Sequence, residues 1–455
     1  MKRTIRILSF LIILFFLVPW IAFASQNPGV VDHVVLISID GFRPDFYLDT
    51  AWPAPRLQQM AREGAHVKMV RGVFPSETYP GHTTLVTGAL PRSHGIYYNV
   101  PFEKDQPTGR YHWYASAIRV PTLWDAVREG GLRSASVLWP VTVGAPIDWN
   151  IPEIWSLDEK VDPLTVLRSA TEPSRLWMDL EQQLEEKLTT TGFMDRQARD
   201  VWSGKTAAYL LEKHRPSLLA VHLVGVDFHQ HHSGRDGEAV HQAVEATDRL
   251  VGEMVEAVRR AGIADRTTFV VTGDHGFVDF DTLVSPNFWL VEAGLREEQR
   301  DGDGWRAVFY RDGGSVFLRL RDEGDTDAVS QVRELLAGLP PASRRLFRII
   351  ESEELERIGA DPASPLALSA TPGVSFTPWS RGPALQKAAG ATHGHFPDFQ
   401  EVQTGLIGWG AGFRSGTVIS TISLEDIAPL VAELLGLELQ APDGGVPRGL
   451  LDPQR

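Results

Sequence analysis

Three apolar runs that each lead into an acidic residue constrain this chain most. The runs span residues 33–39, 217–224 and 267–272, and the acids that follow them are Asp40, Asp227 and Asp274. Near-continuous apolar runs of this length are typical of parallel strands that are buried on both faces. Residues 238–261 carry apolar side chains at helical spacing. The pattern predicts an α/β fold, with a mostly parallel central sheet flanked by helices.

The three acids are expected to converge with histidines at one edge of this sheet, because ligands bind beyond the carboxyl ends of parallel strands. A single acid after a strand is commonly a turn residue. However, His231 follows Asp227 by four residues, which puts both on one face of a helical turn. His275 follows Asp274 directly, and His393 comes later. The chain has no cysteine, so a transition-metal site must use imidazole and carboxylate ligands.

The segment around Thr78 predicts either a nucleophile or a helix cap. It reads Pro75-Ser76-Glu77-Thr78-Tyr79-Pro80-Gly81-His82. Pro80 suits the first turn of a helix, so Thr78 should lie at or just before the helix N-terminus. Free N–H groups and the positive end of the helix dipole favour an anionic phosphoryl group there. A plain N-cap role explains a threonine at this place equally well.

The domain organisation is predicted to be a core with one insertion. Residues 280–390 do not continue the strand and helix pattern of the rest of the chain. A hairpin is expected at 306–320 and a helix at 325–339. We interpret 280–390 as an inserted α+β cap, and 25–279 with 391–455 as the catalytic core. The core is expected to close with a helix over 424–435 that ends at Gly436.

The N-terminus predicts export. Basic residues precede an apolar run, and Ala22-Phe23-Ala24 forms a small-x-small cleavage signal. Residues 1–24 are therefore expected to be a signal peptide or, given the length of the run, an N-terminal anchor. The product would be periplasmic or extracellular, with no further membrane span. The net charge of −14 argues against a nucleic-acid polymer as partner, because neutralising its phosphates requires clustered Lys and Arg.

Several short motifs follow one another along residues 33–450. They are Ile39-Asp40-Gly41, the segment 75–82, Thr87-Gly88, His94-Gly95-Ile96, Asp227 with His231, Gly273-Asp274-His275-Gly276, His393-Gly394 and Asp426-Ile427-Ala428-Pro429. Each is weak alone, but the ordered set resembles the nucleotide pyrophosphatase/phosphodiesterases (type I phosphodiesterases) of the alkaline phosphatase superfamily. The resemblance implies an alkaline-phosphatase-like sheet.

The resemblance also implies two zinc ions and a covalent mechanism. One Zn²⁺ would be held by Asp227, His231 and His393. The other would be held by four ligands, namely Asp40, Asp274, His275 and the hydroxyl of Thr78. Zinc lowers the pKa of a bound hydroxyl, so Thr78 would attack phosphorus and form a phosphothreonine that water then hydrolyses.

The chain departs from the family pattern in its substrate-binding residues. The family commonly carries Asn where this chain has Gly81, and we expect Asn99 to supply an amide to the phosphoryl group instead. Tyr79 and Trp149 are expected to sandwich a nucleobase, as aromatic side chains do in the diesterases. Packing beneath the cap is the alternative role for Trp149.

Charge favours a diester as the substrate. The related threonine-dependent phosphomonoesterases bind the second negative charge of a monoester with a Lys-x-Arg pair, and the matching stretch 136–144 has neither cation. The sequence therefore predicts an exported enzyme that hydrolyses nucleotides or related small phosphodiesters. A phosphomonoesterase or phosphonate hydrolase on the same scaffold is the alternative, and a metal-stabilised binding protein without turnover is a third.

Overall fold

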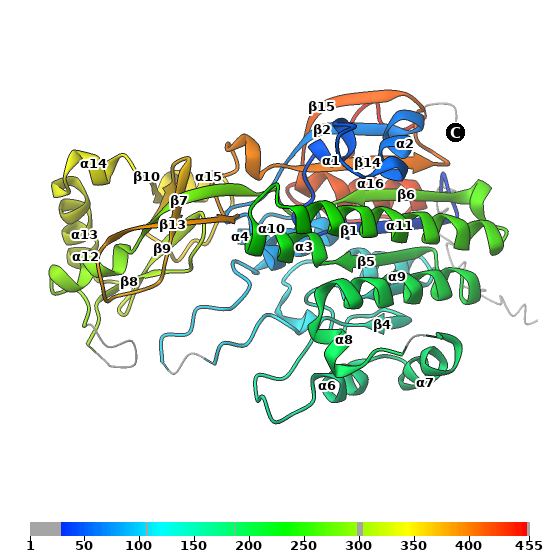
Figure 1. The fold of residues 1–455 in the computed structure, drawn as a ribbon, viewed down its shortest axis with the longest axis horizontal. Helices are drawn as coiled ribbons and strands as arrows, with labels where there is room; N and C mark the ends of the chain where they lie inside the picture. The colour runs from blue at the N-terminus through cyan, green and yellow to red at the C-terminus, as the bar shows by residue number, and fades with distance from the viewer. Residues whose placement is uncertain (1–28, 106–107, 186, 298–303, 453–455) are drawn as a thin grey trace, which may run out of the picture.

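A central sheet organises the larger part of the molecule (Figure 1). The structure is a computed structural model that describes residues 29–105, 108–185, 187–297 and 304–452, so the predicted leader over residues 1–24 lies outside the described residues. Within them the sheet has eight strands in the order β15-β2-β14-β6-β1-β5-β3-β4. The strands are β1 His33–Ile39, β2 Ala65–Arg71, β3 Ser134–Val137, β4 Trp149–Ile151, β5 Leu218–Leu223, β6 Thr267–Thr272, β14 Thr404–Gly410 and β15 Thr417–Ser423.

The sheet is mostly parallel, which confirms the predicted fold class. Strand β1 pairs in parallel with both β5 and β6, and β3 pairs in parallel with β4 and β5. Strand β14 runs antiparallel to β2 and β6. Because β1 lies between β5 and β6, the three apolar runs of the sequence become three neighbouring strands whose carboxyl ends share one edge.

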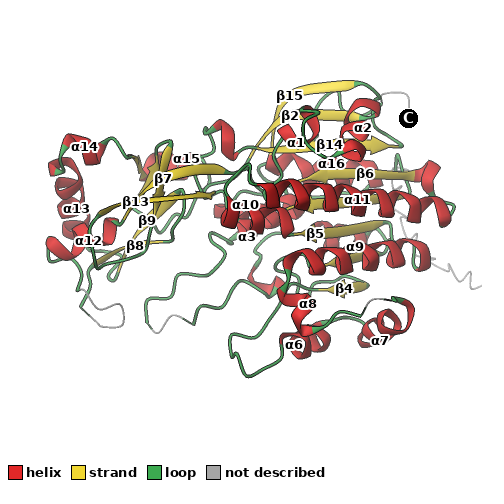
Figure 2. Ribbon diagram, in the orientation of Figure 1, coloured by secondary structure: helices red, strands yellow, loops and turns green. Residues whose placement is uncertain are grey.

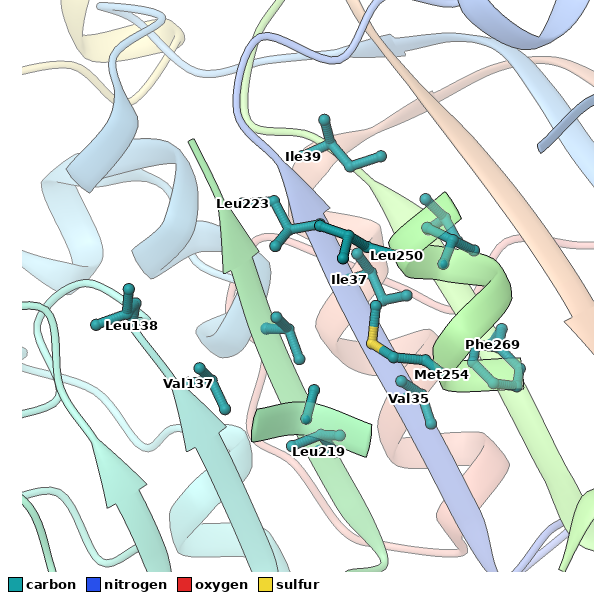
Figure 3. Close-up of a cluster of buried hydrophobic side chains, with 14 of the residues drawn as sticks. Val35, Ile37, Ile39, Val137, Leu138, Leu219, Leu223, Leu250, Met254 and Phe269 are labelled. Carbon is teal, nitrogen blue, oxygen red and sulfur yellow. The ribbon is translucent and has the colours of Figure 1, made fainter. Parts of the chain in front are cut away.

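Both faces of the sheet are buried, which explains the uninterrupted apolar runs. Side chains of β1 alternate between the faces: Val35 and Ile37 enter one core cluster and Leu36 enters the other. Figure 3 shows the first cluster, where these β1 side chains meet Leu250 and Met254 of a long helix.

Helices cover the two faces of the sheet. The first face packs against α2 Pro55–Glu63, α9 Arg196–Lys213 and α11 Glu238–Arg260. The second packs against α3 Thr78–Thr87, α5 Leu123–Glu129 and α16 Ile427–Leu435, which follows a 3-10 turn at Leu424–Asp426. The remaining helices of this part are α1 Asp45–Leu48, α4 Pro91–His94, α6 Pro163–Ala170, α7 Ser174–Gln183, α8 Thr190–Met194 and α10 Gly225–Ser233.

A second lobe is built from the chain between β6 and β14 (Figure 1). It holds a four-stranded antiparallel sheet, β10-β11-β9-β8, and a three-stranded sheet, β12-β7-β13. Figure 2 shows that the lobe contains helices as well as strands. Its elements are β7 Val278–Val284, α12 Pro286–Glu292, β8 Ala307–Tyr310, β9 Ser315–Leu320, α13 Thr326–Gly338, α14 Pro341–Arg344, β10 Phe347–Glu351, α15 Ser352–Arg357, β11 Leu366–Ala370, β12 Gly373–Phe376 and β13 Leu385–Thr392.

The lobe packs directly on the segment that leads into α3. The ring of Phe74 lies 5.0 Å from that of Phe317 on β9 and 5.1 Å from that of Phe396. These rings belong to one buried cluster, so the residues before Thr78 are held by the lobe as well as by the core. Across the described residues, every helix is too short or too polar to cross a bilayer.

Candidate metal and active site

The three predicted acids meet at one edge of the sheet. Asp40 directly follows β1, Asp274 follows β6 after one glycine, and Asp227 lies in the first turn of α10, which begins two residues beyond β5. Asp40 and Asp274 are buried, with exposed fractions of 4% and 0%. Adjacent parallel strands therefore deliver carboxylates to a common, water-poor place.

Asp40, Asp274 and His275 form one candidate ligand group. Nε2 of His275 lies 3.4 Å from Oδ1 of Asp40 and 3.2 Å from Oδ2 of Asp274. These are three of the four ligands expected for one of the predicted ions.

Asp227 is the centre of the second group. Its Oδ1 lies 3.5 Å from Nε2 of His231 and 3.7 Å from Nε2 of His393. The ring of His393 also stacks on that of His275, with centroids 3.7 Å apart. Ligand atoms of Asp227, His275 and His393 lie within 4.8 Å of one another, so the two groups adjoin and share His275.

Backbone carbonyls fix the orientation of the three imidazoles. Nδ1–H of His393 donates to Ser76 O at 2.8 Å, that of His231 to Ala391 O at 3.2 Å, and that of His275 to Gly276 O at 3.1 Å. The proton on Nδ1 leaves a lone pair on Nε2, the nitrogen that faces the carboxylates. A carbonyl behind each ring is the usual support of a histidine that ligates a metal.

Unpartnered buried atoms point to a cation in this place. Among the described residues, Oδ1 of Asp40, Oδ1 of Asp227, Oδ2 of Asp274 and Nε2 of His275 are buried without a hydrogen-bond partner. Buried carboxylates normally require a paired charge or a metal. The unpartnered atoms are the same ones that face each other in the two ligand groups, so the residues present fit divalent cations with nitrogen and oxygen ligands.

Burial shifts the pKa of these groups in opposite directions. It raises the pKa of Asp40 and of Asp274 well above the ordinary value, and the repulsion between neighbouring carboxylates adds to the effect. Burial lowers the pKa of His275 to about 3 and lowers that of His393 well below its ordinary value. The imidazoles of His275 and His393 are therefore neutral at physiological pH, whereas the carboxylates of Asp40 and Asp274 need a positive charge nearby to stay ionised.

Thr78 is the first residue of α3, as the sequence predicted for the helix start. The other nine residues of this helix are buried, and Thr78 alone is partly exposed. Behind it, Nδ1–H of His82 donates to Thr78 O at 2.8 Å, and the same nitrogen lies 3.6 Å from Oδ2 of Asp274. The side chain of Thr78 therefore stands at the accessible N-terminus of a fixed helix.

Asn99 brackets Thr78 on both sides. Its Oδ1 accepts a hydrogen bond from Tyr79 N at 2.8 Å, and its own N–H donates to Oε2 of Glu77 at 3.0 Å. The bond from Tyr79 assigns Oδ1 and so leaves the amide NH₂ group for another acceptor. Asn99 is the residue that was expected to hold a phosphoryl oxygen. It bonds to the residues directly before and after Thr78.

The glycine at position 81 has a structural reason. A Cβ atom placed on Gly81 would lie 2.9 Å from Cβ of Asp274. A side chain at this position would therefore require α3 or Asp274 to shift.

The structure does not bring Trp149 together with the other predicted site residues. Trp149 begins β4 opposite Ala135, at the amino end of the strand, whereas the ligands lie at the carboxyl ends. Its ring stacks on His214 with centroids 4.4 Å apart, and the guanidinium of Arg133 lies 5.0 Å from its centroid. Residue spacing alone did not reveal which end of the strand the ring occupies.

Tyr79 lies beside Thr78, but its ring is covered. Its exposed fraction is 2%, and the ring of Tyr111 lies 5.2 Å away. Tyr111 in turn packs edge-on against Trp155 at 4.8 Å. Trp155, four residues beyond the end of β4, is therefore the second aromatic on this side, and Tyr111 fills the space between the two.

Sequence reasoning missed two polar residues near the site. His222 on β5 contacts Asp40, with Nε2 3.1 Å from Oδ2; its place on a predicted strand next to the acid was the available signal. Arg311 comes from the lobe, and its Nε donates to Oε1 of Glu77 at 2.9 Å. No local pattern could reveal that contact, because the two residues are 234 positions apart.

Comparison with known proteins identifies the family of this chain. The family model described as type I phosphodiesterase / nucleotide pyrophosphatase matches residues 34–395. A venom phosphodiesterase of Macrovipera lebetinus is 22% identical over 441 residues, covering 93% of this chain and 45% of its own. Ectonucleotide pyrophosphatase/phosphodiesterase family member 3 of Rattus norvegicus is 22% identical over 463 residues, covering 94% and 45%. The chain thus spans about half the length of the curated relatives it matches.

Solved structures support the fold. Human ectonucleotide pyrophosphatase/phosphodiesterase 5 superposes with a TM-score of 0.65 at 20% identity, covering 92% of this chain and all of the other. An inactive threonine-to-alanine variant of the murine protein, in complex with AMP, superposes with a TM-score of 0.66 at 20% identity and the same coverage. Because the family model matches most of this chain, the chain belongs to the type I phosphodiesterase / nucleotide pyrophosphatase family.

Proposed function

We propose that this chain is an exported phosphoric diester hydrolase that acts on nucleotides or related small diesters, with Thr78 as nucleophile and two zinc ions as cofactors. The observation that carries the proposal is the set of unpartnered carboxylate and imidazole atoms facing one another beside the exposed start of α3. A binding protein without turnover would not need a partly exposed hydroxyl at that place.

The proposed ligands fall into two sets. Asp227, His231 and His393 would hold one ion. Asp40, Asp274 and His275 would hold the other, together with the Thr78 hydroxyl. Two such ions supply Lewis-acid stabilisation of the entering and leaving oxygens of a phosphoryl displacement.

The side chains of Thr78 and Asn99 would carry out the attack and bind the phosphoryl group. Oγ1 of Thr78 would give up its proton and form a bond to phosphorus, one P–O ester bond would break, and the departing alkoxide would take up a proton and leave as an alcohol. Water then cleaves the Thr78–phosphoryl ester and regenerates the hydroxyl. The amide NH₂ of Asn99 would donate to a phosphoryl oxygen, since its Oδ1 is already engaged by Tyr79 N.

A substrate panel tests this proposal. Zinc-loaded protein would be assayed with bis-p-nitrophenyl phosphate, p-nitrophenyl thymidine monophosphate and p-nitrophenyl phosphate. We expect kcat/KM for both diesters to exceed that for the monoester, because no Lys-x-Arg pair compensates a second charge in residues 136–144. A preference for the monoester would instead favour a phosphomonoesterase on the same scaffold.

A further inference from the structure

A pocket lies between the core and the lobe, and Glu77, the residue before Thr78, is part of its lining. Its volume is about 440 Å³. Glu77 and Asn99 of the core line it together with Arg311, Phe376 and His393 of the lobe. Of the described residues that line it, Arg311 is the only lysine or arginine.

The lobe holds Arg311 in the pocket by a tight turn between β8 and β9. Arg311 has a φ of 80°, a left-handed conformation that costs energy for a residue with a side chain. Three residues after Arg311, the backbone contacts the loop of His393: Gly314 N donates to His393 O at 2.7 Å. A Cβ atom on Gly314 would lie 2.3 Å from the ring of His395. The turn that presents Arg311 is thus fastened to the loop that carries a candidate metal ligand.

The contact with Glu77 uses only one edge of the guanidinium. Nε donates to Oε1 of Glu77 at 2.9 Å, while Nη2 lies 4.0 Å from Oδ1 of Asp312. Apart from a side-chain hydrogen bond with Tyr310, the N–H groups on the terminal nitrogens remain available to an acceptor in the pocket. The Arg311 side chain is 19% exposed and that of Asp312 is 59% exposed, so water screens Asp312 more than it screens the cation.

We propose that Arg311 binds a second anionic group of the substrate, next to the phosphoryl group that Thr78 attacks. The inference rests on the proposed function and adds a specificity residue to it. A guanidinium fork suits the paired oxygens of a phosphate or phosphonate. Glu77 orients the fork, and Arg311 favours diesters and anhydrides whose leaving group carries its own negative charge.

Binding to the zinc-loaded Thr78→Ala protein tests this role without turnover. The probes are AMP and α,β-methylene-ADP, which differ by one anionic group, and the dissociation constants come from titration calorimetry. We expect α,β-methylene-ADP to bind more tightly than AMP, and Arg311→Gln to reduce the affinity ratio roughly tenfold, as for the loss of a charged hydrogen bond at a partly solvated site. Arg311→Lys should retain part of the ratio.

Two further variants make the result specific. Arg333→Gln removes an equally charged lobe side chain whose guanidinium pairs with Glu351 at the surface, 2.7 Å away, and should leave the ratio unchanged. In Arg311→Gln the carboxylate of Glu77 loses its charged partner. The double variant Glu77→Gln/Arg311→Gln also removes that carboxylate, and it should show the same reduced affinity ratio.

An unchanged ratio in Arg311→Gln would overturn the inference, as would an equal loss of affinity for both probes or the absence of binding to either. If the substrate panel showed no diester hydrolysis while the ratio of the two affinities still depended on Arg311, the proposed function would be wrong and the anion site at Arg311 would be confirmed. If the protein hydrolysed diesters but the affinity ratio did not depend on Arg311, the proposed function would hold and the role of Arg311 would be wrong.

Discussion

Nε2 of His222 lies 3.1 Å from Oδ2 of Asp40, while the other carboxylate oxygen of Asp40 faces His275 at 3.4 Å. On its far side, Nδ1 of His222 contacts Leu138 O at 3.2 Å. His222, on β5, thus links the backbone just beyond β3 to the carboxylate just beyond β1, the strands on either side of β5. It fixes which oxygen of Asp40 is turned to the metal site.

His222→Ala is expected to weaken metal binding rather than to unfold the protein. Loss of a residue that supports a metal ligand typically costs 10- to 100-fold in metal affinity, roughly. Competition with a zinc chelator measures the change. The control is His232→Ala, which removes an exposed side chain on α10 whose Nδ1–H donates to Phe228 O of its own helix. Equal zinc affinity in wild type and His222→Ala would contradict this account of the Asp40 contact.

Chelation of the metal is expected to lower the thermal stability of the whole protein. Without cations, Asp40, Asp227 and Asp274 lie close together with buried, unpartnered oxygens. A ligand present at about 1,000 times its dissociation constant stabilises the native state by about 4 kcal/mol, which corresponds to several degrees in Tm. Scanning calorimetry at pH 7.5 with a chelator, and again after adding zinc, measures the effect. Magnesium should restore less stability, because imidazole ligands suit zinc. A Tm that the chelator leaves unchanged would argue against a metal centre here.

Tyr111→Ala is expected to improve the binding of a nucleotide diester. Tyr111 covers Tyr79 and separates it from Trp155, so its removal opens a space between two rings. Stacking of a base is worth about 1–3 kcal/mol, which predicts a several-fold lower KM for p-nitrophenyl thymidine monophosphate. KM for bis-p-nitrophenyl phosphate should change less. Trp149→Ala serves as the control, since its ring packs on His214 at the other end of the strands. A raised KM in Tyr111→Ala would mean that Tyr111 itself holds the substrate.

Glu425 is expected to make stability depend on pH. Burial raises its pKa from 4.5 to about 7. Because the folded-state pKa is raised, the stabilisation is fully present below pH 4.5 and is lost as pH rises through about 7. The loss amounts to about 3 kcal/mol at pH 8.5, at 1.36 kcal/mol per pKa unit.

The variant Glu425→Gln should remove this loss. Its free energy of unfolding should exceed that of wild type at pH 8.5 and approach it at pH 5, as measured by urea denaturation. Glu433→Gln, on the exposed side of α16, provides the comparison. A difference between Glu425→Gln and wild type that does not vary with pH would disprove the assignment.

The sequence predicted those parts of the site that depend on local patterns. Apolar runs ending in acids placed Asp40 and Asp274 at neighbouring strand ends, because parallel strands align their carboxyl ends. The four-residue spacing placed Asp227 and His231 on one face of α10, with ligand atoms 3.5 Å apart. Pro80 located the start of α3 at Thr78.

The parts that failed depend on how distant segments pack. Spacing favoured Trp149 as the second stacking aromatic, but β4 begins at Trp149 and so places it at the other edge of the sheet. Trp155 lies beyond the carboxyl end of that strand, a position that the strand boundary would have revealed. Arg311 reaches Glu77 only because the lobe folds back on the core. A pairing between residues so far apart leaves no trace in local periodicity.

The most direct test of the account is the rate at which zinc-loaded Thr78→Ala hydrolyses bis-p-nitrophenyl phosphate, measured beside wild type and Thr78→Ser at equal zinc content. The account predicts that kcat falls by at least about 1,000-fold in Thr78→Ala and that Thr78→Ser retains part of the activity, because only a hydroxyl at this position can form the covalent intermediate. A Thr78→Ala protein whose kcat stays within about tenfold of wild type would contradict the assignment of Thr78 as the nucleophile.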